Sequence, residues 1–315
     1  MYMKTAGIHH VTAIVGDPQE NVDFYAGVLG QRLVKKTVNF DDPGTYHLYF
    51  GNEGGEPGTI MTFFPWPGAY PGRTGSGQVG VTSFVVPDGA LAFWEDRLKK
   101  FNVSFEKTSR FGEEYLQFID PHGLNLEIVA RKDGKDSAWS FGGVPADKAI
   151  KGFGGATLFS AKPDKTAELL ENVMGLEKIG EEGDYVRFQS TADIGNVIDI
   201  KRSPEAPGMM GTGTVHHIAW RASDYDDHEQ WKHHVAQSGY GVTDVIDRQY
   251  FNAIYFREEG NILFEIATDP PGFTRDESFE EMGKNLLLPP WLEPHRQQIE
   301  ENLLPAQARV LKEDK

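Results

Sequence analysis

The chain has 315 residues, a formal net charge of −16 and no cysteine. Such an acidic chain is poorly suited to bind nucleic acid or an anionic membrane surface, and no apolar run in it is long enough to span a bilayer. Without thiols, disulfides are excluded, and a metal would have to be held by His, Asp, Glu, Tyr or water. The length suits two domains. Because the first residues enter a strand pattern without an apolar leader, we expect a cytoplasmic protein.

Four segments of the chain repeat one pattern, which consists of an alternating strand, a turn at an aspartate, a helix and three further strands. The segments open with Ile8–Asp17, Val79–Asp88, Phe153–Asp164 and Val215–Asp224. The helices are predicted over Asn21–Gly30, Ala90–Phe101, Thr166–Gly175 and Asp226–Gly239. A repeat of this length fixes the architecture. The sequence therefore predicts four βαβββ modules, over residues 7–64, 79–131, 152–202 and 214–270.

Stretches rich in proline and glycine separate the modules. The stretch between the second and third modules, Lys132–Lys151, is the best candidate for a domain boundary. We therefore expect an N-terminal pair of modules over residues 7–131 and a C-terminal pair over residues 152–270. The remaining residues, 271–315, are expected to form a capping segment with an amphipathic helix over Pro289–Pro305.

Two pairs of neighbouring histidines open the first and fourth segments. Counting back seven residues from the aspartate at each turn gives one equivalent position, which is occupied by His10, Val81, Thr157 and His217. The last strand of each segment has an equivalent position that is occupied by Thr62, Glu127, Asp199 and Glu265. These positions include two imidazoles and a matching carboxylate. Together they would form a 2-His-1-carboxylate triad, the ligand set of non-haem Fe(II) enzymes that activate oxygen.

The repeated βαβββ pattern, over roughly residues 7–270, resembles the vicinal oxygen chelate superfamily, which has the glyoxalase, bleomycin-resistance and extradiol dioxygenase fold. The resemblance implies an α+β protein in which two modules pair into a curled mixed β-sheet around a cleft. It also implies that each cleft draws ligands from the opening and closing strands of both modules. One module cannot bury its sheet alone, which is consistent with pairing.

The choice of paired modules decides the ligand set. Pairing the first module with the second offers only His10 and Glu127, and pairing the third with the fourth offers one histidine with two carboxylates. Pairing the first with the fourth offers His10, His217 and Glu265, with Thr62 at a vacant fourth position. Only this last choice gives the triad. We therefore expect the first and fourth modules to pair, and the second and third to form a structural domain without histidine ligands.

Strand geometry distinguishes the two histidines of each pair. Adjacent strand residues face opposite sides of a sheet, so only one histidine of each pair is expected to reach the cleft. The repeat selects His10 and His217. His9 and His216 are then expected beside these ligands or on the reverse face. A single strand histidine is more often a hydrogen-bonded core residue, but two pairs at equivalent positions with a matching glutamate favour a metal site.

The motifs IHHVT, YHLYFG, EKIGEEG and FEIAT give a closer resemblance, to the para-hydroquinone ring-cleaving dioxygenases and their bacterial relatives of quinone detoxification. The similarity runs nearly end to end. It implies an Fe(II) enzyme, with Mn(II) or Zn(II) as substitutes in a purified sample, that cleaves hydroquinone-type or catechol-type diols with O₂ in aromatic catabolism. The residues that match the family's metal ligands are His10, His217 and Glu265.

The same resemblance assigns supporting catalytic roles to five residues: Thr12, His9, His216, Arg248 and Tyr255. Thr12 follows His10 by two residues and so shares its strand face, which suits a role in lining the cleft. Tyr255 and Glu265 flank one hairpin tip, which would let the phenol supply a proton at the metal; an ordinary cross-strand aromatic is the alternative. Arg248 would hold a phenolate or superoxide oxygen, or form a surface salt bridge.

Other functions stay open at this point. Thr62 speaks against a glyoxalase-type isomerase or thiol transferase, because those enzymes fill all four positions with ligands and a hydroxyl is a poor fourth ligand. The intact triad speaks against a metal-free small-molecule-binding module. Glu127 is interpreted as a remnant or a surface residue, and His228, His233 and His234 as solvated side chains of a helix. The identity of the diol and assembly into a homo-oligomer are not determined by the sequence.

Overall fold

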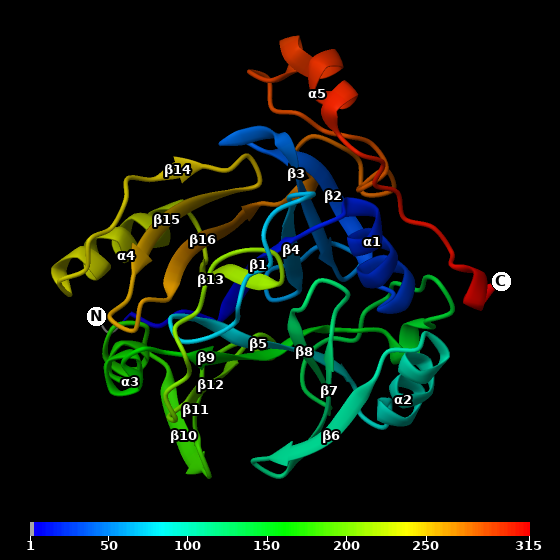
Figure 1. Ribbon diagram of the computed structural model, residues 1–315. Helices are drawn as coiled ribbons and strands as arrows, with labels where there is room; N and C mark the ends of the chain where they lie inside the picture. The colour runs from blue at the N-terminus through cyan, green and yellow to red at the C-terminus, as the bar shows by residue number, and fades with distance from the viewer. Residues whose placement is uncertain (1–2) are drawn as a thin grey trace.

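Two curled, eight-stranded sheets form the body of the protein, one above the other in Figure 1. The computed structural model describes residues 3–315. Each sheet mixes parallel and antiparallel strand pairs, and one apolar core runs through both. The predicted α+β architecture of paired modules in curled mixed sheets is confirmed. No helix within residues 3–315 combines the length and the apolar character needed to cross a membrane.

The first sheet is built from the first and fourth modules. Its strands, in spatial order, are β14 (Ile246–Asp247), β15 (Phe251–Arg257), β16 (Leu263–Pro271), β13 (Thr214–Ala222), β1 (Ile8–Val15), β4 (Ile60–Pro65), β3 (Asp42–Gly51) and β2 (Arg32–Asn39). In the middle, β1 and β13 pair antiparallel, and each pairs in parallel with the closing strand of its own module. The predicted pairing of the first module with the fourth is therefore confirmed.

The second sheet is built from the third and second modules. Its strands, in spatial order, are β10 (Glu177–Glu182), β11 (Tyr185–Gln189), β12 (Val197–Lys201), β9 (Gly152–Phe159), β5 (Gln78–Pro87), β8 (Asn125–Arg131), β7 (Glu113–Ile119) and β6 (Phe105–Arg110). Here β5 and β9 make the central antiparallel pair. The two sheets thus share one topology, and each strand of one sheet has a counterpart at the same place in the other.

One helix follows the opening strand of each module. The four are α1 (Pro18–Val22), extended by a π-helical stretch over Asp23–Val28, α2 (Leu91–Lys100), α3 (Pro163–Asn172) and α4 (Tyr225–Gln237). The last three pack against the closing strands β8, β12 and β16 of their own modules. Trp94 of α2 and Trp231 of α4 are fully buried in these interfaces. Amphipathic helices thus cover the outer face of the sheets, and α2 and α4 each bury one large apolar side chain there.

The C-terminal segment lies along the first sheet, with α5 (Arg296–Asn302) next to β3 (Figure 1). This helix is shorter than the predicted one, because Pro294 is unsuited to a helix interior and lies in a preceding 3-10 turn. Ile299 packs with Val38 and Leu288. The 3-10 turns of the chain are Ala146–Lys148, Phe273–Arg275, Glu293–His295 and Lys312–Asp314.

The central β1–β13 pair contains two β-bulges, and these change one prediction. The pairing shifts between Ile8 and His10, which leaves His9 as the extra residue on β1. It shifts again between Thr12 and Ala13, which leaves His216 as the extra residue on β13. A bulge locally breaks the alternation of side chains. The expectation that only one histidine of each pair reaches the cleft is therefore wrong for the second pair, since His216 and His217 line the same cavity.

The register also corrects one position in the third module. Thr157 pairs with Asp199, whereas the counterpart of Asp199 in the fourth module, Glu265, pairs with Ala219. The residue equivalent to His217 is therefore Gly155, two positions before the predicted Thr157. The reason is that α3 begins after Lys162, so the aspartate used for counting lies inside the helix. The second sheet still has no histidine at either opening position.

Candidate metal centre

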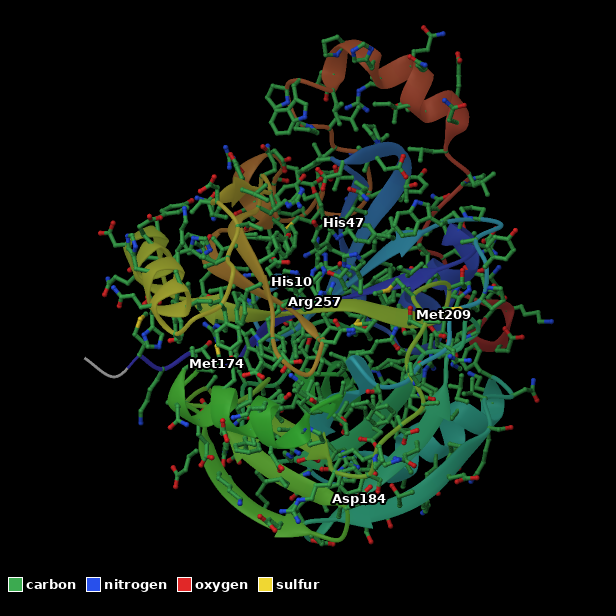
Figure 2. All side chains as sticks on the ribbon, turned by 60° about the vertical axis from the view of Figure 1, so that its left-hand side comes forward. His10, His47, Met174, Asp184, Met209 and Arg257 are labelled. Carbon is green, nitrogen blue, oxygen red and sulfur yellow. The ribbon has the colours of Figure 1, made fainter. Side chains whose placement is uncertain are left out.

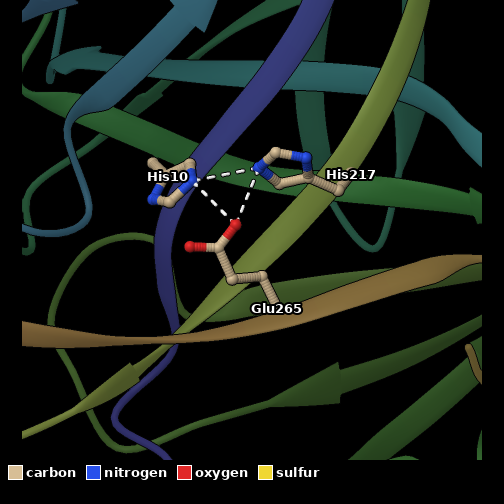
Figure 3. A group of neighbouring side chains, drawn as sticks. All are labelled: His10, His217 and Glu265. Carbon is tan, nitrogen blue, oxygen red and sulfur yellow. Dashed lines mark hydrogen bonds and ion pairs between the residues drawn. The ribbon is translucent and has the colours of Figure 1, made fainter. Parts of the chain in front are cut away.

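Three side chains from three adjacent strands converge in the first sheet (Figure 3). His10 comes from β1, His217 from β13 and Glu265 from β16. The two Nε2 atoms are 3.2 Å apart. Glu265 Oε2 lies 2.9 Å from His217 Nε2 and 3.5 Å from His10 Nε2. All three side chains are buried, and among residues 3–315 they are the one group of His, Asp or Glu side chains placed to hold a metal ion together.

The spacing of these atoms fits a shared metal ion. Ligands about 2.1 Å from a metal lie about 3.0 Å apart at neighbouring octahedral positions and about 3.4 Å apart at tetrahedral ones. The observed separations of 2.9, 3.2 and 3.5 Å fall in this range. Within the described chain, neither oxygen of Glu265 accepts a hydrogen bond, although the residue is buried. An uncompensated buried carboxylate is costly, and a cation at this point would compensate it.

Burial and charge set the protonation states. Burial lowers the pKa of His217, which favours the neutral imidazole, although the charge of Glu265 opposes this shift. Burial alone would raise the pKa of Glu265, but the neighbouring His10 and His217 outweigh it and hold that pKa well below its usual range. A neutral imidazole and an ionised carboxylate are the forms that bind metals. The electrostatics therefore agree with the geometry.

His9 fixes the orientation and the tautomer of His10. Burial lowers the pKa of His9 well below its usual value, so its ring is neutral and carries one N–H. His9 Nε2 lies 3.1 Å from the carbonyl oxygen of Thr268 and must donate to it. His9 Nδ1 is then an acceptor, and His10 Nδ1, 3.0 Å away, donates to it. His10 Nε2 is thereby left with its lone pair toward the triad, as a metal ligand requires.

His216 stands in the same relation to His217. Their Nδ1 atoms are 2.8 Å apart. Burial, together with His217, lowers the pKa of His216 to about 3, so this ring is also neutral. The two bulges thus give each candidate ligand a neighbouring imidazole bonded to the nitrogen that faces away from the triad. His9 and His216 therefore lie beside the candidate ligands, which is the first of the two positions expected for them.

A cavity of about 380 Å³ opens beside the triad. Its aromatic wall consists of Phe40, Phe64, Trp66 and Phe251. Its polar wall consists of the triad and of Asn39, Asp41, His47, Tyr49, His216, Arg248 and Tyr255. Cavities of about 1010 and 640 Å³ lie elsewhere in the described residues, but neither contains a member of the triad. The cavity of about 380 Å³ is therefore the candidate site.

Tyr255 and Arg248 lie together on one side of the cavity. Tyr255 on β15 pairs with Glu265 across the strands. Burial, then the charge of Glu265, raises the pKa of Tyr255 well above its usual value, so the phenol keeps its proton. Arg248 Nε donates to Tyr255 Oη over 3.3 Å, and Arg248 Nη1 lies 2.9 Å from Asp41 Oδ2. The arginine thus connects the phenol to the tip of the β2–β3 hairpin.

On the opposite side, the vacant fourth position is closed by hydrogen bonds. Thr62 Oγ1 lies 2.8 Å from Thr12 Oγ1 and 2.8 Å from His47 Nε2. Thr62 and Thr12 are fully buried and lie behind the cavity wall, so Thr12 does not line the cleft as predicted. His47, which was not predicted, does line it. The one sequence signal for His47 was its place in the YHLYFG motif, because no other module has a histidine at that strand position.

The corresponding centre of the second sheet is filled by protein charges. Glu127 is buried and receives two hydrogen bonds from Arg110, over 3.0 and 2.7 Å. Asp199 is bound by Arg110 over 2.7 Å and by Arg187 over 2.7 and 2.9 Å. Of the two interpretations of Glu127, that of a surface residue is therefore wrong, because Glu127 belongs to a buried ion-pair network. His228 is also not solvated: it is buried, with Nε2 2.8 Å from the carbonyl oxygen of Ile266.

Several known proteins are similar to the chain over almost its whole length. "Putative ring-cleaving dioxygenase MhqO" of Bacillus subtilis (strain 168) is 68% identical over 311 residues, which cover 99% of this chain and 100% of the relative. "Chlorohydroquinone/hydroquinone 1,2-dioxygenase" of Sphingobium indicum is 38% identical over 302 residues, which cover 92% of this chain and 93% of the relative. A crystal structure titled as a putative dioxygenase from Bacillus subtilis shows 68% identity and a TM-score of 0.97, covering 98% of this chain and 100% of that chain.

A family comparison gives the same result. The model of the Glyoxalase/Bleomycin resistance protein/Dioxygenase superfamily matches residues 7–128 and 152–274. The two matches contain the opening strands of all four modules and each member of the triad. The matches, the fourfold repeat and the paired curled sheets agree: the chain belongs to the Glyoxalase/Bleomycin resistance protein/Dioxygenase superfamily.

Proposed function

We propose that the protein is an Fe(II)-dependent ring-cleaving dioxygenase that acts on aromatic diols of the hydroquinone type. The observation that carries the proposal is a buried group of two imidazoles and one carboxylate whose fourth position holds a hydroxyl already engaged in hydrogen bonds. Three protein ligands would leave coordination positions for substrate and oxygen. The names of the relatives, among them a hydroquinone dioxygenase, support the same reaction class.

The metal would be held by His10, His217 and Glu265. When bound there, Fe(II) would lower the pKa of a coordinated phenol and allow electrons to pass between the diol and O₂. Mn(II) or Zn(II) would fit the same spacing as substitutes. The hydrogen bonds from His9 to Thr268 and from His10 to His9 would hold the first imidazole in the required tautomer.

The cavity suits a single aromatic ring. Its volume of about 380 Å³ lies at the lower end of small-molecule sites. The ring of Phe251 lies 5.0 Å from that of His10, and that of Phe64 lies 5.9 Å from that of His216. These aromatic walls would hold the planar substrate beside the triad and keep water out. Such packing favours small aromatic rings over the glutathione-type substrates of thiol transferases.

Tyr255 would act as a proton donor. A ring-cleaving dioxygenase places both oxygen atoms in the product, so the protein side chains need only bind, orient and move protons. Burial keeps the phenol protonated, and Arg248 holds its oxygen in place. A general acid so positioned can protonate a substrate oxygen as the ring opens.

Two other functions are less well supported. A glyoxalase-type isomerase or thiol transferase needs a fourth ligand, and the Thr62 hydroxyl is held by Thr12 and His47 instead. A metal-free binding module does not explain the buried Glu265 without a hydrogen-bond donor. In the proposed role the enzyme would remove hydroquinones in the cytoplasm, as part of aromatic catabolism or quinone detoxification.

Oxygen uptake tests the proposal. The protein is reconstituted anaerobically with Fe(II), and oxygen consumption is recorded with hydroquinone, methylhydroquinone and catechol. We expect oxygen consumption with at least one para-diol, one O₂ per diol and a ring-opened product. His233→Gln, a change at an exposed histidine of α4, serves as a matched control and should not alter the rate. Absence of oxygen consumption with all three diols by the iron-loaded protein would overturn the proposal.

A further inference from the structure

The first sheet places two tyrosines in equivalent positions on the two sides of the cavity. Tyr255 on β15 pairs with Glu265 at the closing-strand position of the fourth module. Tyr49 on β3 pairs with Thr62 at the same position of the first module. Both phenols line the cavity. The internal repeat therefore builds a second phenol opposite the one assigned to proton donation.

Each tyrosine has its own polar partner. Tyr255 is bound by Arg248, whereas Tyr49 Oη lies 2.8 Å from Nδ1 of His47. Burial lowers the pKa of His47 well below its usual value, so the ring is neutral. Burial, then the charge of Glu265, raises the pKa of Tyr49 well above its usual value, so this phenol also stays protonated. Figure 2 labels His47 and His10 together in the half of the molecule that holds the first sheet.

The hydrogen bonds run in a chain behind the cavity. A neutral imidazole has one donor and one acceptor nitrogen, and both are used: Nδ1 meets Tyr49 and Nε2 meets Thr62. The Thr62 hydroxyl in turn meets Thr12. His47 and Thr62 therefore have no free position for a ligand. A phenol oxygen can take part in more than one hydrogen bond, so Tyr49 keeps capacity for one more partner on the cavity side.

Most of the other polar side chains that line the cavity already form hydrogen bonds within the protein. Arg248 is paired with Asp41 and Tyr255, and His216 is bonded to His217. Two competitors remain. The side-chain oxygen of Asn39 accepts from the backbone of Asp41, and its amide nitrogen makes no hydrogen bond within the described chain. His216 uses only Nδ1 in its bond to His217, so its Nε2 is open. Both of these side chains are partly exposed, whereas Tyr49 is almost wholly buried, at 1% exposure. An unshared hydrogen-bonding position at so buried a site favours a specific ligand group.

We propose that Tyr49, held by His47, binds the second hydroxyl of the aromatic diol, the one that is not at the metal. The inference rests on the proposed function and makes it more specific. The two oxygens of a para-diol lie at opposite ends of the ring and cannot reach one metal ion together, so one of them needs a partner on the protein. Tyr49 and His47 supply this partner, and they make the cavity selective for para-diols over phenols that lack the second hydroxyl.

The test compares hydroquinone with 4-methoxyphenol, in which a methyl group blocks the second hydroxyl. Anaerobic titration of the Fe(II)-loaded protein gives the two dissociation constants, and oxygen uptake gives the two kcat/KM values. The wild type should prefer hydroquinone. Tyr49→Phe should weaken hydroquinone binding about tenfold, the effect of one lost hydrogen bond, and leave 4-methoxyphenol binding nearly unchanged. His47→Gln should shift the same ratio in the same direction.

A buried tyrosine outside the cavity provides the matched control. Tyr250 packs near Tyr49, with ring centroids 6.1 Å apart, but its hydroxyl donates to Asp276 and does not line the cavity. Tyr250→Phe should leave the hydroquinone to 4-methoxyphenol ratio unchanged. An unchanged ratio in both Tyr49→Phe and His47→Gln, with metal retained, would overturn the inference, as would loss of selectivity in Asn39→Ala alone. If the wild type binds the two phenols differently but consumes no oxygen, the proposed function fails and the inference about the binding position is still decided.

Discussion

The two sheets of this protein share one topology, but the carboxylates at their equivalent central positions have different partners. In the first, His10, His217 and Glu265 converge, and the carboxylate of Glu265 accepts no hydrogen bond from the described residues. In the second, Glu127 and Asp199 are compensated by two arginine side chains. Paired and bidentate buried charges are satisfied within the protein. What distinguishes the candidate site from its counterpart is therefore an unsatisfied buried group, and the fold itself is the same in both.

Removal of one carboxylate from each centre should give the largest difference between the two sheets, in metal binding. Glu265→Gln should abolish metal binding and reduce oxygen uptake to background, because one of three ligands is lost. Glu127→Gln should leave metal content unchanged. Metal analysis and oxygen uptake of the two variants, after the same iron loading, check both expectations. Retention of metal by Glu265→Gln would show that the triad is not the site.

The order of the two variants should reverse when stability is measured, with the larger loss in Glu127→Gln. Glu127→Gln removes one of the two carboxylates that bind the buried Arg110, and breaking a buried pair in this way costs up to about 3–5 kcal/mol. Glu265→Gln removes a carboxylate that accepts no hydrogen bond, so the metal-free protein should lose much less stability. Denaturant unfolding without metal measures both changes. Equal losses would contradict the difference in compensation between the two centres.

Tyr255→Phe tests whether the phenol on this side of the cavity donates a proton. Loss of a general acid typically lowers turnover about a hundredfold, and the phenol oxygen of Tyr255 accepts a hydrogen bond from Arg248. We expect kcat to fall by about this factor while iron content stays at the wild-type level. Steady-state oxygen uptake with metal analysis is the measurement. An unchanged kcat would mean that Tyr255 merely packs against the sheet.

Much of this centre follows from the sequence because the ligand positions are periodic. His10, His217 and Glu265 recur at fixed places in a repeat, and the choice between module pairings can be made by comparing their ligand sets. Two positions were open for His9 and His216, and the choice between them could not be predicted, because it depends on bulges set by the pairing of two distant strands. The repeat gave no signal for His47, which is present in one module only. The ion pairs of Glu127 likewise depend on Arg110, which lies two strands away in the same sheet.

The two sheets should also differ in their response to acid. His47 in the first sheet has a pKa depressed by burial. Below about pH 6.5, the usual histidine pKa, the unfolded chain therefore binds a proton that the folded chain does not, so stability falls as the pH falls. In the second sheet, burial alone would raise the pKa of Glu113. Hydrogen bonds from Arg131 and its neighbours outweigh this effect and lower the pKa of this carboxylate to about 2. Its contribution is present above about pH 4.3 and is lost as the pH falls toward 2.

Unfolding of the metal-free protein between pH 7 and pH 3 tests this difference. His47→Gln should flatten the loss of stability between pH 6.5 and 5, and Glu113→Gln should flatten only the loss below about pH 4.3. A His47→Gln profile that runs parallel to the wild-type profile above pH 5 would contradict the assignment. The two carboxamides serve as controls for each other.

The smallest effect is expected at the hairpin tip. Asp41 is 72% exposed as a side chain, and its pair with Arg248 spans 2.9 Å. Exposed pairs contribute about 0–1 kcal/mol, which corresponds to at most about a fivefold change. Asp41→Asn should therefore lower kcat by no more than this factor, and the effect should shrink at high salt. A loss as large as that of Tyr255→Phe would mean that the hairpin tip, and not burial, holds the arginine in place.

Metal stoichiometry tests the central difference between the two sheets most directly. The purified protein is stripped of metal, loaded anaerobically with Fe(II), freed of excess ion and analysed for iron per chain. We predict about one ion per chain in the wild type, because one cleft of the described chain carries such a triad, about one in Asp199→Asn and none in His10→Ala. Two tightly held ions per chain, or a single ion lost in Asp199→Asn and kept in His10→Ala, would contradict the assignment of the metal to the first sheet.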